Sequence, residues 1–322
     1  MQPITTSFFG QSLISIGQFN SIAPVLDLFS TADKMRTVIE KREIFEPLRG
    51  KAVAILFYQP STRTFTSFHA AATRLGAYVI DIQEMGQYSS AAKGESLEDT
   101  MQTIEQTVAA DLIILRHPED YSSQIAADTV SLPIVNAGSG KAEHPTQALL
   151  DLYTIYQKFG RIDNLHVAMV GDLKYGRTIK SLAKLLALSG SNNRLTFVAP
   201  KELAAPDELL KDLGSNVKIT CKEELNGTLA EADVVYMTRV QREWFEKEGK
   251  LDRYEQLKNQ FILTRHLAGL MPADSIIMHP LPRVGEIMQE VDDDPRAYYF
   301  KQMRSGLYVR MALLARILCQ EI

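Results

Sequence analysis

The sequence predicts an α/β fold with two doubly wound domains, each built on a parallel sheet that is covered by helices. Short apolar runs rich in β-branched residues alternate with segments of helical periodicity along the chain. This alternation is typical of parallel sheets covered on both faces. About ten such runs are too many for one open sheet. The length of 322 residues also fits two domains of roughly 100–200 residues each.

The expected strands are short apolar runs bounded by polar residues: Ala52–Tyr58, Ala77–Ile82, Asp111–Leu115, Pro133–Asn136, His166–Val170, Arg194–Val198, Val217–Thr220, Asp233–Met237, Phe261–Leu263 and Ser275–Met278. The expected helices carry apolar residues every three or four positions. Examples are Thr64–Leu75, Ser96–Val108, Pro145–Phe159, Arg177–Leu188 and Gly306–Cys319.

A stretch between the two groups of strands suggests the domain boundary. Residues Asn136–His144 read NAGSGKAEH, which is rich in Gly and Ala and has no periodicity. A plain loop and a hinge beside a cleft both fit this composition. We therefore expect a first domain at residues 1–143 and a second at 144–303. The C-terminal helix, at residues 304–322, is expected to pack back on the first domain.

Composition limits the function classes. Hydrophobic residues make up 45% and charged residues 23%, with a net charge of -4, and no run of Lys and Arg suggests a nucleic-acid surface. Only Cys221 and Cys319 are present, which excludes a CxxC metal motif and favours a reducing compartment. The first basic residue is Lys34 and no apolar run reaches ~18 residues. We expect no signal peptide, no membrane association and a cytoplasmic location.

The stretch FYQPSTRTFTSF places three hydroxyls and an arginine directly after the first expected strand, at Ser61, Thr62, Arg63 and Thr64. A strand followed by a helix exposes backbone N–H groups that favour an anion. The hydroxyls add donors, and the guanidinium suits phosphate. The alternative is a simple helix cap, because Ser and Thr are common N-cap residues.

Other candidates follow later strands of the first half. Ser89 and Lys93 lie in a polar stretch before a helix that Ser96 is expected to cap. Arg116 follows the run DLIIL, and HPTQ opens a helix with His144 and Gln147. Each has a structural alternative: a solvated lysine, a surface arginine or a buried histidine with satisfied hydrogen bonds.

The second half repeats the pattern. Arg177 ends GDLKYGR after the run LHVAMV, Arg239 and Gln241 follow ADVVY, and Pro280 and Leu281 follow SIIM. The segment GDLKYGRT resembles a nucleotide-binding P-loop, but Arg177 stands where that motif needs lysine. Because parallel sheets bring strand ends to one side, polar residues after six strands indicate a shared anion-binding cleft.

The ordered set FYQPSTRT, SSAAKGESLEDT, LRHP, NAGSGKAEHPTQALLD, VAMVGDLKYGRT, YMTRVQRE and MHPLPR resembles the aspartate/ornithine carbamoyltransferase family along nearly the whole chain. HPTQALLD, GDLKYGRT, TRVQ and HPLPR point to its aspartate branch, since ornithine enzymes typically carry cysteine where this chain has Pro280. The resemblance implies transfer of a carbamoyl group from carbamoyl phosphate to L-aspartate. The products are N-carbamoyl-L-aspartate and phosphate, in de novo pyrimidine biosynthesis.

The resemblance also implies residue roles. The phosphate is bound by Ser61, Thr62, Arg63 and Thr64. The phosphate or the carbonyl oxygen is contacted by Arg116 and His144, which act as oxyanion donors together with Thr64. The carbamoyl amide is held by Gln147, Pro280 and Leu281. The two carboxylates of aspartate are bound by Arg177, Arg239 and Gln241.

By the same resemblance, Ser89 and Lys93 reach into the site of a neighbouring subunit, which makes a homotrimer with shared active sites the minimal active unit. The expected catalytic group is Arg63, Thr64, Lys93, Arg116 and His144. No metal or organic cofactor follows from the sequence. A regulatory chain or a dihydroorotase partner is left open.

Three positions depart from the family pattern: Gln59 replaces a glutamate, Phe65 a basic residue and Trp244 an arginine. In relatives the first and third form an ion pair between the domains. Because both partners of this ion pair are replaced here, neither replacement leaves an unpaired charge. We hypothesise that closure here uses a Gln59–Arg177 hydrogen bond and packing of Trp244; unchanged kinetics in Gln59→Glu would exclude the first part.

Three alternatives remain beside the aspartate enzyme. The chain could carbamoylate another amine, although the retained Arg177, Arg239 and Gln241 favour a dicarboxylate. It could be a non-catalytic structural or regulatory trimer, although a decayed site has no reason to keep the STRT segment with Lys93 and His144. A nucleotide-binding protein is the third.

Overall fold

The computed structural model describes residues 2–190 and 192–322. The chain divides into two compact units: unit 1 is Met1–Tyr153 with Met303–Ile322, and unit 2 is Thr154–Gln302. The division falls inside helix α6 (Pro145–Phe159), whereas the sequence places the domain boundary before that helix.

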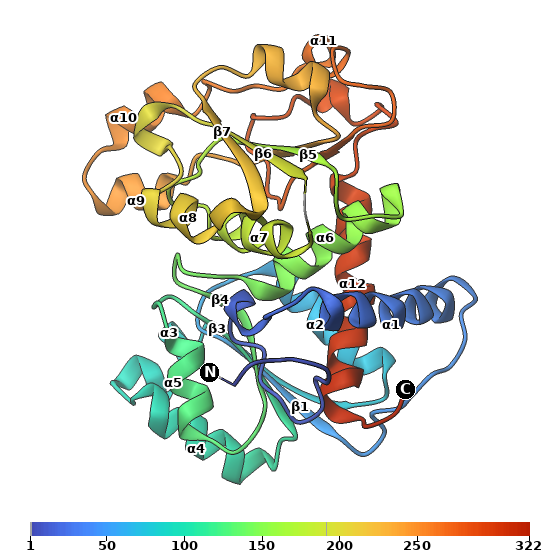
Figure 1. Cartoon of the computed structure of the whole chain (residues 1–322). Helices are drawn as coiled ribbons and strands as arrows, with labels where there is room; N and C mark the ends of the chain where they lie inside the picture. Colours follow the sequence, from blue (N-terminus) through green and yellow to red (C-terminus); the bar gives the residue numbers. More distant parts are fainter. Residues whose placement is uncertain (1, 191) are drawn as a thin grey trace. The chain divides into compact units, whose positions relative to one another are not determined.

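Unit 1 is built on a four-stranded parallel sheet with the order β2-β1-β3-β4 (Figure 1). Its strands are β1 (Ala52–Phe57), β2 (Tyr78–Gln83), β3 (Leu112–His117) and β4 (Ile134–Ser139). The two inner strands, β1 and β3, are almost completely buried. Because helices cover both faces of a parallel sheet, its inner strands are continuous apolar runs and do not alternate with polar residues.

Helices lie on both sides of this sheet (Figure 1). They are η1 (Ile16–Gln18), α1 (Ala23–Glu40), α2 (Thr62–Arg74), α3 (Met85–Tyr88), η2 (Ser90–Lys93), α4 (Leu97–Val108) and α5 (Ser122–Thr129). Met101 of α4 and Ala126 of α5 share one buried cluster with Leu115 of β3. On the other side, Phe65 of α2 meets Phe57 of β1 edge-on, with ring centroids 5.6 Å apart.

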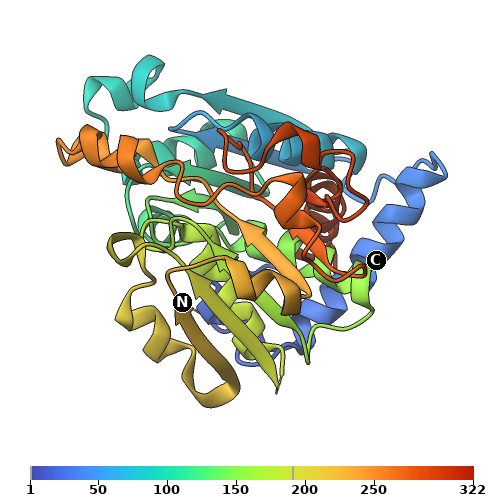
Figure 2. The ribbon, with the colours of Figure 1, turned by 90° about the horizontal axis from the view of Figure 1, so that it is seen from above.

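Unit 2 contains a five-stranded parallel sheet with the order β7-β6-β5-β8-β9. Its strands are β5 (His166–Val170), β6 (Asn193–Val198), β7 (Val217–Lys222), β8 (Val234–Met237) and β9 (Ile276–Met278). The neighbouring strands β5, β6 and β7 can be followed in Figure 1, and Figure 2 shows the same sheet from above. The predicted fold class is confirmed, since both sheets are parallel and carry helices.

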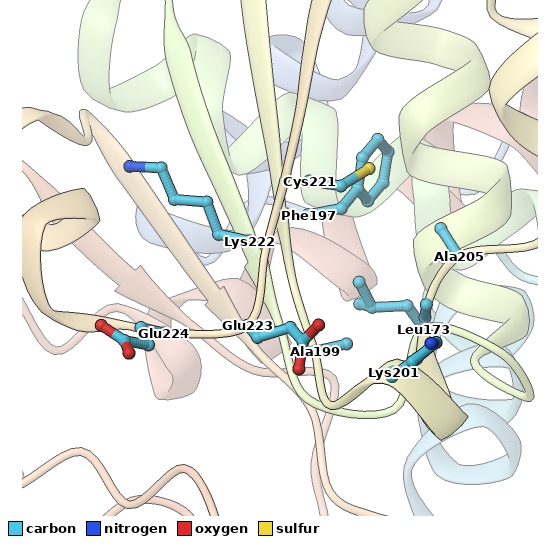
Figure 3. Close-up of a pocket in the computed structure, with 10 residues that line it drawn as sticks. Leu173, Phe197, Ala199, Lys201, Ala205, Cys221, Lys222, Glu223 and Glu224 are labelled. Carbon is cyan, nitrogen blue, oxygen red and sulfur yellow. The ribbon is translucent and has the colours of Figure 1, made fainter.

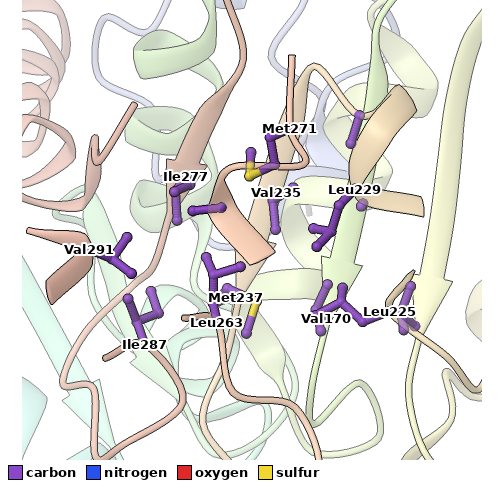
Figure 4. Close-up of a cluster of buried hydrophobic side chains, with 14 of the residues drawn as sticks. Val170, Leu225, Leu229, Val235, Met237, Leu263, Met271, Ile277, Ile287 and Val291 are labelled. Atoms are coloured by element: carbon purple, nitrogen blue, oxygen red, sulfur yellow. The ribbon is translucent and has the colours of Figure 1, made fainter. Parts of the chain in front are cut away.

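The helices of unit 2 are α7 (Arg177–Leu188), η3 (Lys201–Leu203), α8 (Asp207–Asp212), η4 (Gly214–Asn216), η5 (Asn226–Glu231), α9 (Arg242–Lys247), α10 (Leu251–Leu257), α11 (Arg265–Ala268) and η6 (Gln289–Val291). A buried cluster joins the β8–β9 half of the sheet to the following loops (Figure 4). Val235, Met237 and Ile277 contribute from the strands, Leu263 from a loop and Val291 from η6.

The C-terminal helix α12 (Tyr299–Leu318) begins earlier than the predicted Gly306 and packs on unit 1. The backbone of Gly10 donates to the carbonyl of Ile317 at 2.9 Å, and Arg310 donates to the hydroxyl of Ser67 in α2. The predicted return of this helix to the first domain is confirmed. In the part of the chain that the structure describes, no helix is both long and apolar enough to cross a membrane.

Two local predictions are wrong. Phe261–Leu263 is not a strand, because Leu263 makes only an isolated bridge to Ile287. Three apolar residues cannot distinguish a strand from an irregular segment that packs on a core. The stretch Asn136–Ser139 is not a loop but the buried end of β4. The side chain of Asn136 holds this end of the strand, since it donates to the Ile14 carbonyl and accepts from the Gly138 amide.

Candidate active site

Each sheet has a topological switch point, and the STRT segment, Arg116, Arg177 and Arg239 belong to the strands or following segments at these points. In unit 1 the chain moves from β1 to β2 on one side, while β3 pairs with the other side of β1. In unit 2, β5 has β6 on one side and β8 on the other. Ligands of doubly wound sheets bind beyond the carboxyl ends of strands at such points.

The segment after β1 enters α2 without a side-chain cap. Ser61 occupies the N-cap position with extended backbone (φ -160°, ψ 90°), but its side chain makes no capping hydrogen bond. Thr62 and Arg63 are exposed in the first turn, and Thr64 is buried. The capping alternative is therefore wrong for the Ser61 hydroxyl. Elsewhere a cap does form as predicted, because the Ser96 hydroxyl accepts from the Asp99 amide at 3.0 Å.

Thr64 and His144 meet from two different helices. The Thr64 hydroxyl lies 3.5 Å from Nε2 of His144, and both side chains are buried. Thr64 is in the first turn of α2, and His144 immediately precedes α6. The start of each helix thus brings one of these groups to the same edge of the sheet.

Arg116 lies in β3 and not after it, which corrects the predicted strand end at Leu115. It is aligned with Phe57 of β1, and the Tyr58 amide donates to its carbonyl at 2.9 Å. Its guanidinium donates from Nη1 to the Ala137 carbonyl of β4 at 3.1 Å. The half-buried Arg116 is therefore held between the ends of β1 and β4.

Gln147 belongs to a buried polar chain within unit 1. Its Nε2 donates to Oδ1 of Asp151 at 2.8 Å. Because a carboxylate only accepts hydrogen bonds, the amide nitrogen must face Asp151 and the carbonyl oxygen must face away. Asp151 also interacts electrostatically with Arg310 of α12, a completely buried guanidinium whose pKa falls to about 10 through burial despite that carboxylate.

Ser89 and Lys93 lie in the short segment between α3 and α4. The Ser89 hydroxyl donates to the Met85 carbonyl at 2.6 Å and accepts from the Ala91 amide at 3.2 Å. Lys93 ends η2 and is exposed. This segment, unlike the STRT helix, does not extend from a strand end at the switch point of unit 1.

In unit 2, Asp172 joins the loops after β5 and β8. Its carboxylate accepts from the amides of Tyr175 at 3.0 Å and Gln241 at 3.1 Å, and its own amide donates to the Thr238 hydroxyl at 3.1 Å. Burial raises the pKa of Asp172 to about 6, although these amides oppose the rise. Asp172 thereby sets the spacing between the segments that carry Arg177 and Gln241.

Gly171 allows these two loops to approach. Its φ is +115°, and a Cβ atom there would lie 2.3 Å from the Thr238 carbonyl oxygen. Any other residue would meet both a disfavoured backbone conformation and a collision with backbone. The glycine is thus required by the close contact between the ends of β5 and β8.

Glu243 links the two predicted carboxylate-binding arginines. Arg239 donates from both terminal nitrogens to Glu243, with Nη1 to Oε2 at 2.9 Å. Burial alone would raise the pKa of Glu243, but the bonds from Arg239 and the charge of Arg177 hold it below its ordinary value. Arg177 is the first residue of α7 and is half-buried.

The segment after β9 is held by a buried histidine and glutamate. His279 accepts at Nδ1 from the Leu281 amide at 2.7 Å, and its Nε2 lies 2.6 Å from Glu286. The first bond requires an unprotonated Nδ1, so Nε2 carries the proton and donates to Glu286. Burial opposes ionisation of Glu286, but the bond from His279 lowers its pKa. This pair fixes the backbone of Leu281, which has a φ of 54°.

A pocket of about 550 Å³ in unit 2 lies at the carboxyl ends of β6 and β7 (Figure 3). Phe197, Leu173 and Cys221 line it, with Lys201 and Glu223 at its margin. Burial raises the pKa of the Cys221 thiol, which makes it a poor nucleophile. Among residues 2–190 and 192–322, no three His, Cys, Asp or Glu side chains are grouped to hold a metal ion.

Sequence reasoning missed Asp172, Glu243, His279 and Glu286. His279 stands directly after an expected strand and Asp172 two positions after another, so the rule that located the arginines could have found them. No sequence motif or strand-end position pointed to Glu243 or Glu286. Their roles come from partners on the same or a neighbouring loop.

Two parallel-sheet units with arginine-bearing loops at their switch points define a two-domain α/β protein suited to anionic ligands. Two family models match the chain: "Aspartate/ornithine carbamoyltransferase, carbamoyl-P binding domain" matches residues 11–157, and the "Asp/Orn binding domain" of that family matches residues 163–317. The chain belongs to the aspartate/ornithine carbamoyltransferase family. The P-loop alternative is therefore excluded.

Individual relatives support the same family assignment. The chain is 45% identical to the multifunctional protein CAD of Squalus acanthias over 97% of its own length, but it spans only 14% of that protein. It is 43% identical to an aspartate carbamoyltransferase catalytic subunit of Clostridium kluyveri, covering 96% of this chain and 98% of the relative. Aspartate transcarbamoylase of Trypanosoma cruzi, crystallised with carbamoyl phosphate and aspartate, matches with a TM-score of 0.91 and 37% identity over 99% of this chain and 100% of that one.

Proposed function

We propose that this chain is an aspartate carbamoyltransferase, which transfers the carbamoyl group of carbamoyl phosphate to the amine of L-aspartate in pyrimidine biosynthesis. The observation that carries the proposal is the pair of switch points, each lined by arginines at neighbouring strand ends. The relatives named for this activity match nearly all of the chain. Unit 1 would bind carbamoyl phosphate, and unit 2 would bind aspartate.

The phosphate would bind at the start of α2. Its backbone N–H groups favour an anion, and the Ser61 hydroxyl is not used as a cap. Thr62 and the guanidinium of Arg63 would complete the phosphate contacts. Thr64, Arg116 and His144 would donate to the carbonyl oxygen as negative charge develops there.

The carbamoyl amide would be recognised by hydrogen-bond acceptors. The carbonyl oxygen of Gln147 faces away from Asp151 and would accept from the amide nitrogen. The backbone carbonyls of Pro280 and Leu281 would do the same, since the His279–Glu286 pair fixes their segment. A site of acceptors would discriminate against acyl phosphates that lack this N–H₂ group.

Aspartate would be held through its two carboxylates by Arg177, Arg239 and Gln241. Glu243 orients Arg239 and moderates the positive charge while the site is empty. The aspartate amine would attack the carbamoyl carbon, and the phosphate would leave with its bonding electron pair. The leaving phosphate can accept the amine proton, so no covalent nucleophile or protein base is required. Positioning two substrates would supply much of the rate, with effective molarities on the order of 10⁵ M in good cases.

The assembly and location are part of the same proposal. Ser89 and Lys93 would complete the site of a neighbouring subunit in a cytoplasmic homotrimer. The match to a segment of a multifunctional protein supports association with further enzymes of the pathway, with a dihydroorotase or a regulatory chain as the candidates.

The test is carbamoyl transfer by the purified chain with carbamoyl phosphate and either L-aspartate or L-ornithine. Saturable formation of N-carbamoyl-L-aspartate, with no product from ornithine, is the expected result. A folded protein that binds phosphate but produces neither compound would overturn the proposal. Carbamoylation of a different amine would instead support the alternative that this enzyme uses another acceptor, which the departures at Gln59 and Trp244 suggested.

A further inference from the structure

Trp244 is the only tryptophan of the chain, and it stacks on a tyrosine beside the carboxylate-binding residues. It lies in α9, and its ring is 5.9 Å from that of Tyr175, with an angle of 13° between the planes. Phe245 contacts the same tyrosine edge-on at 6.3 Å. Tyr175 is buried, so α9 covers a residue of the loop after β5.

Tyr175 is also held at the other end of α9. Its hydroxyl donates to Glu248, the residue that ends this helix, at 2.7 Å. Two lysines flank the stacked rings: Nζ of Lys174 is 5.0 Å from the Tyr175 ring, and Nζ of Lys247 is 4.6 Å from the Trp244 ring. Ammonium groups within about 6 Å of aromatic rings are attracted to their faces.

The stack joins the two segments that carry the proposed aspartate ligands. Tyr175 precedes Arg177 by two positions, and Trp244 directly follows Glu243, the partner of Arg239. Asp172 connects the same two segments through backbone amides. Two contacts therefore connect these segments: the hydrogen bonds to the Asp172 carboxylate near their start, and the packing of Trp244 on Tyr175 further along.

We propose that Trp244 is a positioning residue that holds α9 against the loop after β5, and so sets the distance between Arg177 and Arg239 for a dicarboxylate. This inference rests on the proposed function, since it assigns the dicarboxylate as aspartate. It also predicts that the emission of the single indole reports occupancy of the carboxylate site, because an anion bound to Arg239 would compete with Glu243, the residue next to Trp244.

The experiment compares Trp244→Leu with the conservative Trp244→Phe in the full chain. Because the stacked contact with Tyr175 is lost, we expect Trp244→Leu to raise KM for aspartate about threefold to tenfold. KM for carbamoyl phosphate should stay within about twofold, and Trp244→Phe should restore most of the affinity. Tyr175→Phe keeps the stack but loses the Glu248 bond, and it provides an intermediate case if Trp244→Leu folds poorly.

The second measurement titrates wild-type protein with succinate, which has both carboxylates but no amine, in the presence of carbamoyl phosphate. Saturable change in tryptophan emission at the concentrations where succinate competes with aspartate supports the inference. An active enzyme with unchanged KM for aspartate in Trp244→Leu, or equal changes in KM for both substrates, overturns it. Failure of the proposed function is distinguishable, because the wild-type protein would then form no carbamoyl-aspartate.

Discussion

At the scale of single residues, the site depends on buried polar side chains that hold the loops rather than on the arginines alone. Asp172 spans two loops of unit 2, and Glu286 fixes the Leu281 backbone through His279. In unit 1, Asp151 determines which end of the Gln147 amide is presented. Each of these groups is buried, and an unsatisfied partner would cost about 1–3 kcal/mol.

Asp172 should make stability depend on pH. Its pKa rises from the ordinary 3.8 to about 6 in the folded chain, a shift worth about 3 kcal/mol. This contribution is fully present below pH 3.8 and is lost as the pH rises through about 6, because ionisation of a buried carboxylate favours the unfolded state. Denaturant unfolding between pH 4 and 8 should show this fall in the wild type.

Asp172→Asn is the matched variant, since its amide does not titrate. The slope of unfolding free energy against pH should be smaller in the variant between pH 4 and 7. Identical slopes for the two proteins would show that Asp172 does not titrate in this range.

At the scale of elements, close contacts between loops create the candidate site. The ends of β5 and β8 approach so closely that only glycine fits at position 171. In unit 1, Arg116 at the end of β3 reaches across to the Ala137 carbonyl of β4. The helices contribute by their starting points, as Thr64 and His144 show.

Gly171→Ala should damage unit 2 by forcing these loops apart. The added Cβ meets the Thr238 carbonyl oxygen at 2.3 Å, at a φ of +115°, so we expect a loss of about 1–3 kcal/mol in unfolding free energy. KM for aspartate should rise more than KM for carbamoyl phosphate. Urea unfolding and initial-rate kinetics measure the two effects.

Gly214→Ala is the control for this variant. Gly214 also has a positive φ, of +63°, but a Cβ there meets nothing within 4 Å. It should lose only about 1 kcal/mol and keep wild-type kinetics. Equal kinetic defects in both variants would mean that the contact between the β5 and β8 loops does not set the site.

At the scale of the whole molecule, two units with the same kind of sheet each supply one half of the proposed chemistry. Unit 1 carries the hydroxyl-rich start of α2, and unit 2 carries the arginines after β5 and β8. The proposed trimer would add Ser89 and Lys93 from a neighbouring chain. In this proposal, activity is a property of the assembly.

A mixing experiment tests the shared site. Arg63→Ala and Lys93→Ala should each be nearly inactive alone. If one chain supplies Arg63 and its neighbour supplies Lys93, each hybrid trimer contains one intact site, so random reassembly of an equal mixture should return about a quarter of the wild-type activity. Mass measurements must first show that hybrid trimers have formed. If the mixture is then as inactive as each variant alone, neighbouring chains do not share active sites.

Local sequence patterns predicted most helices and strands, and they identified the polar residues that follow the strands. Periodicity located β5, α6 and α7 with their observed bounds, since apolar spacing reflects which faces are buried. It failed at Phe261–Leu263, where three apolar residues pack on a core without a ladder. The partners of Glu243 and Glu286 could not be predicted, because their pairing depends on how loops fold.

The sequence by itself determined that basic and hydroxyl residues follow successive strands, because such motifs are local. Only the tertiary structure decided that β1 lies beside β3 and β5 beside β8, which puts the STRT helix next to Arg116, and the Arg177 loop next to Arg239. Strand order is a non-local property, since it depends on where crossover helices return each strand to the sheet. The buried links through Asp172, Asp151 and the Tyr175–Trp244 stack follow from that order, and so they appear only in the folded chain.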